Sequence, residues 1–276
     1  MSEPICCPCC GGGGGVYWSE ELGFKLVRCP ECSLLYVNPR PDAAAIDSGV
    51  REGMQKVNGK TISVRSRRIP RKIGLYKRDL RTLFPDLWQK NAPLRWVDVG
   101  AGYGETLEAV KSLAHPDSEL VGVEPMQYKA VSARQRGLNI IESYLQPGLF
   151  QADVISAIDI FSHIPDFHGF LATVRTNLAP GGNVLIETGN LADLTLREEF
   201  PGELGLPDHL VFAGEKTLER YLRDAGLKVV AIHRKRIDGV GESAKSVVKM
   251  LLGRPVKLGI PYTSNFRQLM IRAQAV

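Results

Sequence analysis

Four cysteines in two short motifs are the residues whose type and spacing point most directly to chemistry. Cys7-Pro8-Cys9-Cys10 and Cys29-Pro30-Glu31-Cys32 each place two thiols with two residues between them. This spacing lets both thiolates of a motif face one metal ion, and two such motifs complete a tetrahedral zinc site. The predicted ligands of one zinc ion are Cys7, Cys10, Cys29 and Cys32.

The same residues leave two alternatives to this ligand set. Cys6 and Cys9 form a shifted motif, although the flanking proline and glycine favour Cys7 and Cys10. Free or redox-active thiols are the second alternative, but a redox motif of this kind should open a helix after a strand. Because four thiolates leave no open coordination position, we expect the metal to stabilise the fold of a small module and not to catalyse.

A second pattern is the glycine-rich run Asp98-Val99-Gly100-Ala101-Gly102-Tyr103-Gly104, which follows an apolar strand and opens a helix. Glycines let the backbone approach a ligand closely, and the helix N-terminus behind them offers free N–H groups. About 20 residues later the next strand ends at Glu124, from where a carboxylate can accept both hydroxyls of a ribose. A plain tight turn and a nicotinamide site are the alternatives, and the glycine spacing differs from the dinucleotide fingerprint.

The elements that must position these residues alternate between short apolar strands and amphipathic helices. Strands are expected at 96–99, 120–124, 139–142, 154–161, 183–187, 228–233 and 266–272, and helices at 105–113, 128–136, 167–178 and 216–225. Repeated strand–helix–strand units predict an α/β fold with a doubly wound, largely parallel sheet. We expect three parts: residues 1–41 with every cysteine, a helical connector at 42–93, and the α/β domain at 94–276.

Composition restricts the class of protein. The 276 residues are 44% hydrophobic and 24% charged, which is ordinary globular usage and excludes a disordered chain. The net charge of +5 is too small to require a polyanionic partner. With neither a long apolar run nor a secretory signal in this sequence, we expect a cytoplasmic protein without a membrane span.

Together these motifs resemble the class I S-adenosylmethionine-dependent methyltransferases. The order C-P-x-C-G, R-C-P-x-C, L-x-Y-V-N-P-R-P and D-x-G-x-G-x-G is similar to bacterial members that carry an N-terminal zinc ribbon. The resemblance implies a Rossmann-like seven-stranded sheet whose last strand is antiparallel. It also implies an enzyme that methylates a small molecule, such as a sugar, a glycan precursor or a secondary metabolite.

The resemblance also implies a set of residues around the cofactor. The glycine loop would line the methionine and ribose, Asp98 would orient that loop, Glu124 would hold the ribose, and Pro125 and Met126 would lie along the adenine. The family usually has an adenine contact after the third strand, where this sequence has Ser143 and no aspartate. The implied cofactor-binding residues are Asp98, Gly100, Ala101, Gly102, Gly104, Glu124, Pro125, Met126, Ser143 and Phe161.

On the acceptor side, the resemblance points to residues after the fourth and fifth strands. His163 and His209 are the candidate general bases, since a histidine with a pKa near 6.5 suits proton removal at neutral pH. Glu187 would stand behind them. Structural roles for either histidine are the alternative.

A basic segment opens a competing function. Residues 60–81 contain nine Lys or Arg against the single acid Asp79. The segment is either the solvated face of a helix, a contact for a phosphorylated substrate, or an RNA-binding surface of an RNA methyltransferase that also uses the ribbon. The ribbon as a docking module for another protein is a third possibility.

Overall fold

The computed structural model describes residues 2–57, 60–63, 67–200, 202–236 and 265–276. Arg65 of the basic segment lies outside these residues. Seven strands form a central sheet in the order β10-β9-β8-β11-β12-β15-β14. Their bounds are β8 (Arg95–Val99), β9 (Glu119–Val123), β10 (Ile140–Ile141), β11 (Ala152–Ile158), β12 (Leu178–Gly189), β14 (Leu227–Lys235) and β15 (Gln268–Ala275).

The topology of this sheet determines where a ligand can bind. The pairs among β8, β9, β10, β11 and β12 are parallel, whereas β15 runs antiparallel between β12 and β14. The order of strands reverses between β8 and β11, so a crevice opens at the carboxyl ends of those two strands. The predicted α/β fold with a seven-stranded sheet and an antiparallel last strand is confirmed.

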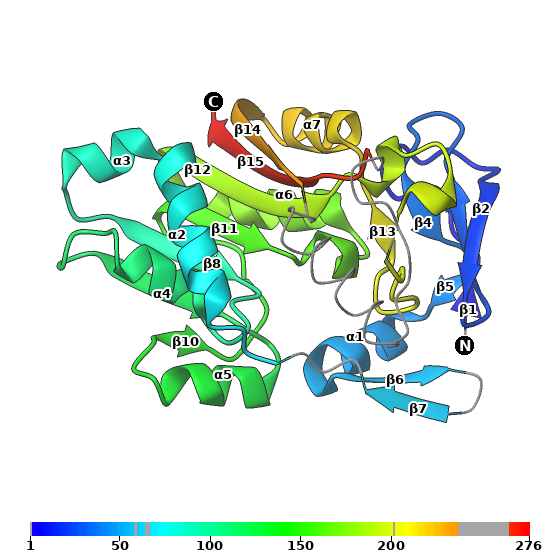
Figure 1. The fold of residues 1–276 in the computed structure, drawn as a ribbon, viewed down its shortest axis with the longest axis horizontal. Coiled ribbons are helices and arrows are strands. Elements are labelled where there is room, and N and C mark those ends of the chain that lie inside the picture. The colour runs from blue at the N-terminus through cyan, green and yellow to red at the C-terminus, as the bar shows by residue number, and fades with distance from the viewer. Residues whose placement is uncertain (1, 58–59, 64–66, 201, 237–264) are drawn as a thin grey trace, which may run out of the picture.

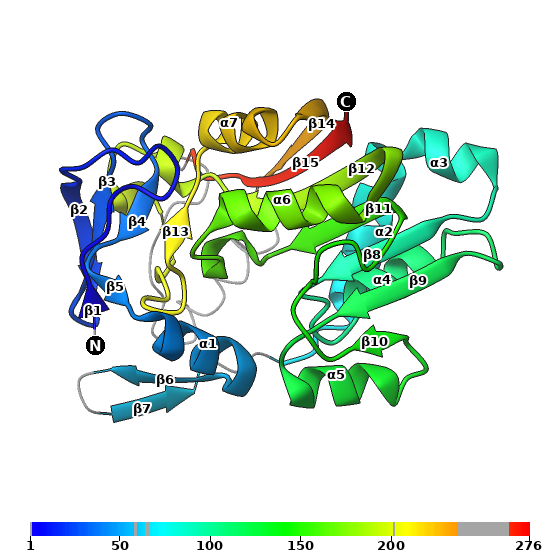
Figure 2. The same ribbon diagram turned by 180° about the vertical axis from the view of Figure 1, so that it is seen from behind.

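Helices cover both faces of the sheet. One face packs against α2 (Arg71–Leu83), α4 (Glu105–Lys111) and α5 (Gln127–Arg134), whose buried residues share a core with Trp96 and Leu185. The other face packs against α6 (Phe167–Asn177) and α7 (Glu215–Asp224), with Val97 and Ile155 between them. Figures 1 and 2 show α2 and α6 on opposite sides. Alternate residues of each central strand therefore supply two separate cores, as a sheet buried on both faces requires.

The cysteine-bearing N-terminus forms a second, smaller sheet in the order β13-β4-β3-β2, with all neighbours antiparallel. Its strands are β2 (Val16–Glu21), β3 (Phe24–Arg28), β4 (Leu35–Val37) and β13 (Val211–Phe212). Strand β13 comes from the segment between β12 and α7, so the two sheets share one stretch of chain (Figure 1). Two short strands, β1 (Ser2–Glu3) and β5 (Arg40–Pro41), pair beside this ribbon.

The segment at 42–93, expected as a helical connector, holds helices and a hairpin. Helix α1 (Ala43–Glu52) begins at Asp42, whose side chain accepts from the Ala45 N–H. It ends at Gly53, and the hairpin of β6 (Met54–Val57) and β7 (Lys60–Ser63) follows. Helix α3 (Pro85–Lys90) comes after α2. Three short 3₁₀ helices lie elsewhere: η1 (Phe161–His163), η2 (Leu191–Asp193) and η3 (Arg197–Glu199).

Candidate active site

A cavity of about 950 Å³ opens at the carboxyl ends of the central strands. Its walls come from the loop after β8, the end of β9, the loop after β11, the segment before β13, and helices α1 and α2. Such a volume lies at the upper end of ordinary ligand pockets, so two molecules can be held side by side. The crevice at the carboxyl ends of the strands is thus also lined by elements from the N-terminal third of the chain.

The glycine loop forms the floor of this cavity. Gly100 and Gly102 have φ angles of 67° and 56°, which favour residues without a Cβ atom. A Cβ at Gly100 would stand 2.5 Å from Ile160 Cγ2, whereas a Cβ at Gly102 would meet nothing nearer than a backbone oxygen at 4.0 Å. Gly100 is therefore required for packing, while Gly102 leaves open space through which a ligand can approach the backbone.

Glu124 stands at the end of β9 with its carboxylate already oriented. Its Oε2 accepts from the Gly102 N–H at 2.7 Å, and its Oε1 accepts from the Met126 N–H at 2.8 Å. The side chain lines the cavity although the residue is only 5% exposed. Each oxygen retains a further lone pair, so this carboxylate can accept two more hydrogen bonds from vicinal hydroxyls.

Asp98 lies deeper, behind the described part of the cavity wall. The residue is 1% exposed, and its Oδ1 accepts from Ser156 Oγ at 2.5 Å across the β8–β11 pair. Ser156 Oγ in turn accepts from the indole N–H of Trp96 at 2.8 Å. Burial raises the pKa of Asp98 to about 7, although the Ser156 hydrogen bond opposes the shift. Asp98 therefore supports β8 below the glycine loop.

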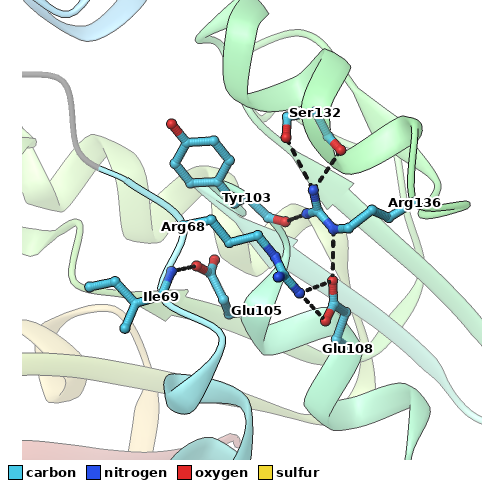
Figure 3. Close-up of polar contacts among 7 residues, drawn as sticks. All are labelled: Arg68, Ile69, Tyr103, Glu105, Glu108, Ser132 and Arg136. Atoms are coloured by element: carbon cyan, nitrogen blue, oxygen red, sulfur yellow. Dashed lines mark hydrogen bonds and ion pairs between the residues drawn. The ribbon is translucent and has the colours of Figure 1, made fainter.

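Arginines fix the same loop from outside (Figure 3). Arg136, just beyond α5, donates to the Tyr103 carbonyl oxygen and to Glu108 Oε1. Arg68 donates to both oxygens of Glu108, at 2.7 and 3.0 Å. The Ile69 N–H donates to Glu105 Oε1 at 2.8 Å. Helix α4 is thereby tied to α5 on one side and to the chain entering α2 on the other.

The remaining predicted cofactor residues divide into two groups. Ala101, Pro125, Met126 and Ser143 line the cavity. Gly104 and Phe161 lie behind its described wall: Gly104 begins α4, where a Cβ would collide with Leu138, and Phe161 packs its ring against Phe167 and Tyr221.

Two histidines and an aspartate meet at another part of the cavity wall. The rings of His163 and His209 lie 4.8 Å apart between centroids in an edge-to-face arrangement. Asp208 Oδ1 stands 3.6 Å from His163 Nδ1 and accepts from Gln55 Nε2 at 3.0 Å. One ligand-capable atom from each of His163, Asp208 and His209 falls within 4.8 Å of the others. The structure thus brings the two predicted histidines together and adds Asp208 and Gln55 to them.

The ring nitrogens of the two histidines have distinct partners. His209 Nδ1 lies 2.7 Å from the Leu204 carbonyl oxygen, and His163 Nδ1 lies 3.0 Å from the Asp208 carbonyl oxygen. Because a carbonyl oxygen only accepts, both Nδ1 atoms carry the proton and both Nε2 atoms are free to accept when the rings are neutral. Burial, and then the charge of His163, lower the pKa of His209.

Glu187 lies apart from this pair. It is 1% exposed, and its Oε1 accepts from Lys235 Nζ at 2.9 Å, while the same ammonium donates to Asp79. Burial raises the pKa of Glu187 to about 7, and the charge of Asp159 adds to the shift. The residue thus stands behind the described cavity wall, in a buried charged triad that joins β12, β14 and α2.

The described cavity is lined by a glycine loop, by an acid after the second central strand and by two histidines beside Asp208. The chain that forms this cavity is similar to known proteins. The sequence profile of the methyltransferase-domain family matches residues 69–232, more than half of the chain. The chain belongs to the class I S-adenosylmethionine-dependent methyltransferases. The resemblance to these methyltransferases that the sequence motifs indicated is therefore confirmed, as is the expectation that the protein is an enzyme.

Curated relatives of this methyltransferase match over part of their length. It is 29% identical over 156 residues to the C-methyltransferase NovU of Streptomyces niveus, which covers 52% of this chain and 35% of NovU. It is 27% identical over 161 residues to a ubiquinone biosynthesis O-methyltransferase of Burkholderia pseudomallei, which covers 50% of this chain and 66% of the relative. The chain thus spans less than two thirds of the curated relatives that it matches.

Solved structures share the fold at low identity. The geranyl diphosphate C-methyltransferase of Streptomyces coelicolor superposes with a TM-score of 0.52 at 14% identity, covering 75% of this chain and 84% of that one. A methyltransferase from Archaeoglobus fulgidus gives 0.52 at 19% identity, covering 73% and 94%. At these identities the likeness extends to the fold of the methyltransferase domain alone.

Sequence reasoning missed the contribution of the N-terminal third to this site. Two residues of α2 line the cavity: Tyr76, which is only 7% exposed, and Lys72, whose Nζ lies 3.0 Å from Asp159 Oδ2. Asp47 on α1 accepts from the Tyr144 hydroxyl at 2.7 Å. A signal for this helix was the apolar spacing of Tyr76, Leu80 and Leu83, which begins within the basic segment and marks a buried helix face.

The side chains of the four predicted zinc ligands lie close together in the N-terminal ribbon. The distances between Cys7 and Cys32 Sγ and between Cys10 and Cys29 Sγ are both 3.5 Å, and the four sulfurs lie within 4.8 Å of one another. With a Zn–S distance of about 2.3 Å, the edge of a tetrahedron is about 3.8 Å, so a zinc ion fits between them.

The two cysteine turns also have the same backbone hydrogen bonds. The Gly11 N–H donates to the Cys7 oxygen, as the Ser33 N–H does to Cys29, and both Gly11 and Ser33 have positive φ. The two knuckles therefore have equivalent geometry in the frame of Cys7 and Cys29, and Cys6, outside that frame, is exposed.

No helix in the described part of the chain combines the length and the apolar character needed to cross a membrane.

Proposed function

We propose that this methyltransferase moves the methyl group of S-adenosylmethionine to the carbon or oxygen of a small molecule, with His209 as the general base. The observation that carries the proposal is that one cavity is lined both by Glu124 and the glycine loop and by the His163–His209 pair. Similarity to a C-methyltransferase and to an O-methyltransferase of ubiquinone biosynthesis supports this acceptor class.

The cofactor end fits S-adenosylmethionine. Glu124, already fixed by two N–H donors, would accept the ribose hydroxyls, and the open side of Gly102 would admit the amino-acid part. Pro125, Met126 and Ser143 would lie along the adenine, while Asp98 would join β8 to β11 through Ser156 below the glycine loop. When bound, the cofactor supplies a methyl group that its sulfonium makes electrophilic, so the protein mainly aligns the acceptor and excludes water.

At the acceptor end, the residues of the chain divide the work of proton transfer. His209 donates its Nδ1 proton to the Leu204 oxygen, so its neutral Nε2 can take a proton from an acceptor hydroxyl or from carbon beside a carbonyl. Since burial lowers the pKa of His209, the ring is neutral at pH 7. Asp208, oriented by Gln55, lies beside His163, with its Oδ1 3.6 Å from His163 Nδ1.

The described part of the basic segment gives less support to the RNA alternative. Arg68 is paired with Glu108, Lys72 with Asp159, and Arg78 lies 3.6 Å from Asp79, all within the molecule. The Arg68 and Lys72 pairs attach α2 and the chain entering it to the catalytic domain, which leaves fewer charges for phosphates. We therefore favour the small-molecule acceptor, with zinc in the ribbon as a structural ion.

Transfer of an isotopically labelled methyl group tests the proposal. The protein is incubated with trideuteromethyl S-adenosylmethionine and either the low-molecular-mass fraction or the total RNA of a bacterial extract. We expect label in the low-mass fraction, and a loss of about 100-fold or more in His209→Asn. The control His115→Asn, at a distant loop, should retain the activity. Label found in RNA alone would overturn the proposed acceptor class.

A further inference from the structure

The segment that carries His209 is held by the N-terminal ribbon, residues 1–41. This segment runs from β12 to α7, residues 190–214, and is described except at 201. It supplies Leu204, Asp208 and His209 to the cavity wall. In Figure 2 the ribbon and β13 lie side by side at one end of the molecule, far from α4 and α5. The acceptor end of the cavity is thus built where the two sheets meet.

The ribbon contacts the beginning of this segment through hydrogen bonds from Arg28, the last residue of β3. Its two terminal nitrogens donate to the carbonyl oxygens of Ala192 and Leu194, at 2.6 and 2.7 Å. The Trp18 indole N–H donates to the Thr195 oxygen at 3.4 Å. A guanidinium donating to two carbonyl oxygens fixes both position and direction of the chain, because its donors lie in one rigid plane.

The middle of the segment is held by Glu21, the last residue of β2. Its Oε1 accepts from the N–H groups of Gly205 and Leu206, at 2.7 and 3.1 Å, and its Oε2 accepts from the Leu204 N–H at 2.8 Å. Three consecutive backbone donors therefore converge on one carboxylate from the opposite end of the sequence. Charge-assisted bonds of this kind are roughly twice as strong as neutral ones.

The turn held by Glu21 is the turn that orients His209. The Leu204 oxygen accepts from His209 Nδ1 at 2.7 Å, and the Gly205 oxygen accepts from the His209 N–H at 3.1 Å. Gly205 has a φ of 74°, and a Cβ there would stand 3.1 Å from His209 Nδ1. On the far side of His209, β13 pairs with β4 of the ribbon. The imidazole is thus fixed on both sides by contacts that lead to the ribbon.

We propose that the ribbon is a positioning module of the acceptor site, and that Glu21 is a positioning residue that acts through the 204–206 turn on His209. The inference rests on the proposed function, since it concerns the base of that reaction. It gives the ribbon a role beyond folding: Glu21 sets the ring of the base without touching the acceptor or the cofactor.

Histidine titration by NMR in the complex with S-adenosylhomocysteine tests this. Glu21→Gln replaces one accepting oxygen by an NH₂ group, which cannot accept from the turn. The groups that act on His209 are His163 beside its ring, Asp208 before it and, at longer range, Asp159. Because burial is the main cause of the low pKa of His209, a released ring should titrate at higher pH, nearer to 6.5. Glu20→Gln, an exposed neighbour in β2 with the same change in charge, is the matched control.

We expect Glu21→Gln to raise the pKa of His209 while the affinity for S-adenosylhomocysteine stays unchanged, and Glu20→Gln to alter neither. A His209 curve in Glu21→Gln that superposes on the wild-type curve would overturn the inference alone. Failure of the wild-type protein to bind S-adenosylhomocysteine would instead overturn the proposed function. If Glu21→Gln does not fold, Glu21→Asp, which withdraws the carboxylate by one methylene, should give a smaller shift in the same direction.

Discussion

At the scale of single residues, a functional pattern and a structural duty can coincide in one side chain. Asp98 opens the glycine motif, which led us to expect it to orient the loop, and the structure places it within β8 with Ser156 of β11 as its partner. Glu124, which follows the neighbouring strand β9, is also a carboxylic acid, but it lines the cavity. Sequence spacing predicts which strand ends carry acids, whereas the depth of each acid depends on packing that spacing does not encode.

The buried Asp98 should make stability depend on pH. Its pKa in the folded protein, about 7, lies above the ordinary value of 3.8, so folding favours the protonated acid. The loss of unfolding free energy caused by ionising this buried carboxyl group is absent below pH 3.8, grows as the pH rises, and levels off above pH 7. Asp98→Asn has no titrating carboxyl group at this position. Between pH 5 and pH 8, the free energy of unfolding in urea should therefore fall by about 2 kcal/mol or more in the wild type, and this part of the fall should be absent in the variant. The exposed Asp117→Asn serves as control, and an Asp98→Asn profile parallel to wild type would contradict the expectation.

At the scale of elements, periodicity predicted those that are long and local. The seven strands and four helices of the catalytic domain follow from alternating apolar patterns, and six of the strands lie within three residues of their expected ends. The seventh, expected at 183–187, is β12, which begins five residues earlier at Leu178. The strand expected at 154–161 ends at Ile158, because the chain turns into the 3₁₀ helix at Phe161–His163. Strand β13 has two residues, and it exists only because β4 lies beside it. Pairing between distant segments leaves no periodic signal in either of them.

Sequence periodicity likewise did not predict that helix α1 lies at the cofactor end of the cavity. The role of α1 there can be measured. The Tyr144 hydroxyl donates to Asp47 on α1 at 2.7 Å, and the Arg51 guanidinium lies 4.7 Å from the Tyr144 ring centroid. Both Asp47 and Tyr144 line the cavity, beside the predicted adenine residue Ser143. We expect α1 to complete the adenine end of the site, where the aspartate usual in the family is missing after the third strand.

Isothermal titration with S-adenosylmethionine tests this role of α1. Tyr144→Phe keeps the ring but loses one hydrogen bond, so its affinity should fall by about two- to tenfold. Glu124→Ala, which removes the proposed ribose acceptor, should lose about tenfold or more. Tyr17→Phe on the exposed face of the ribbon should bind as wild type. Equal affinities for Tyr144→Phe and wild type would separate α1 from the cofactor site.

At the scale of the whole molecule, the hydrophobic core crosses the proposed boundary between ribbon and catalytic domain. Cys7, Cys29 and Tyr36 belong to the same buried cluster as Phe167 of α6 and Tyr221 of α7. Thr217 Oγ1 donates to the Cys32 oxygen, and His168 Nε2 lies 3.0 Å from the Cys9 oxygen. We therefore expect the ribbon and the catalytic domain to unfold together and not as separate modules.

Metal content and melting together test that expectation. The wild-type protein should contain one zinc per chain by elemental analysis, and Cys29→Ser/Cys32→Ser should contain none, because two of four thiolates are lost. Cys6→Ser, outside the four-sulfur cluster, should keep the metal. Since metal-binding free energy is also folding free energy, the double variant should melt in one transition about 10 °C or more below wild type. Two separate transitions, with the later one at the wild-type temperature, would mean that the shared core does not couple the parts. In that case the ribbon could not transmit its metal-dependent order to His209.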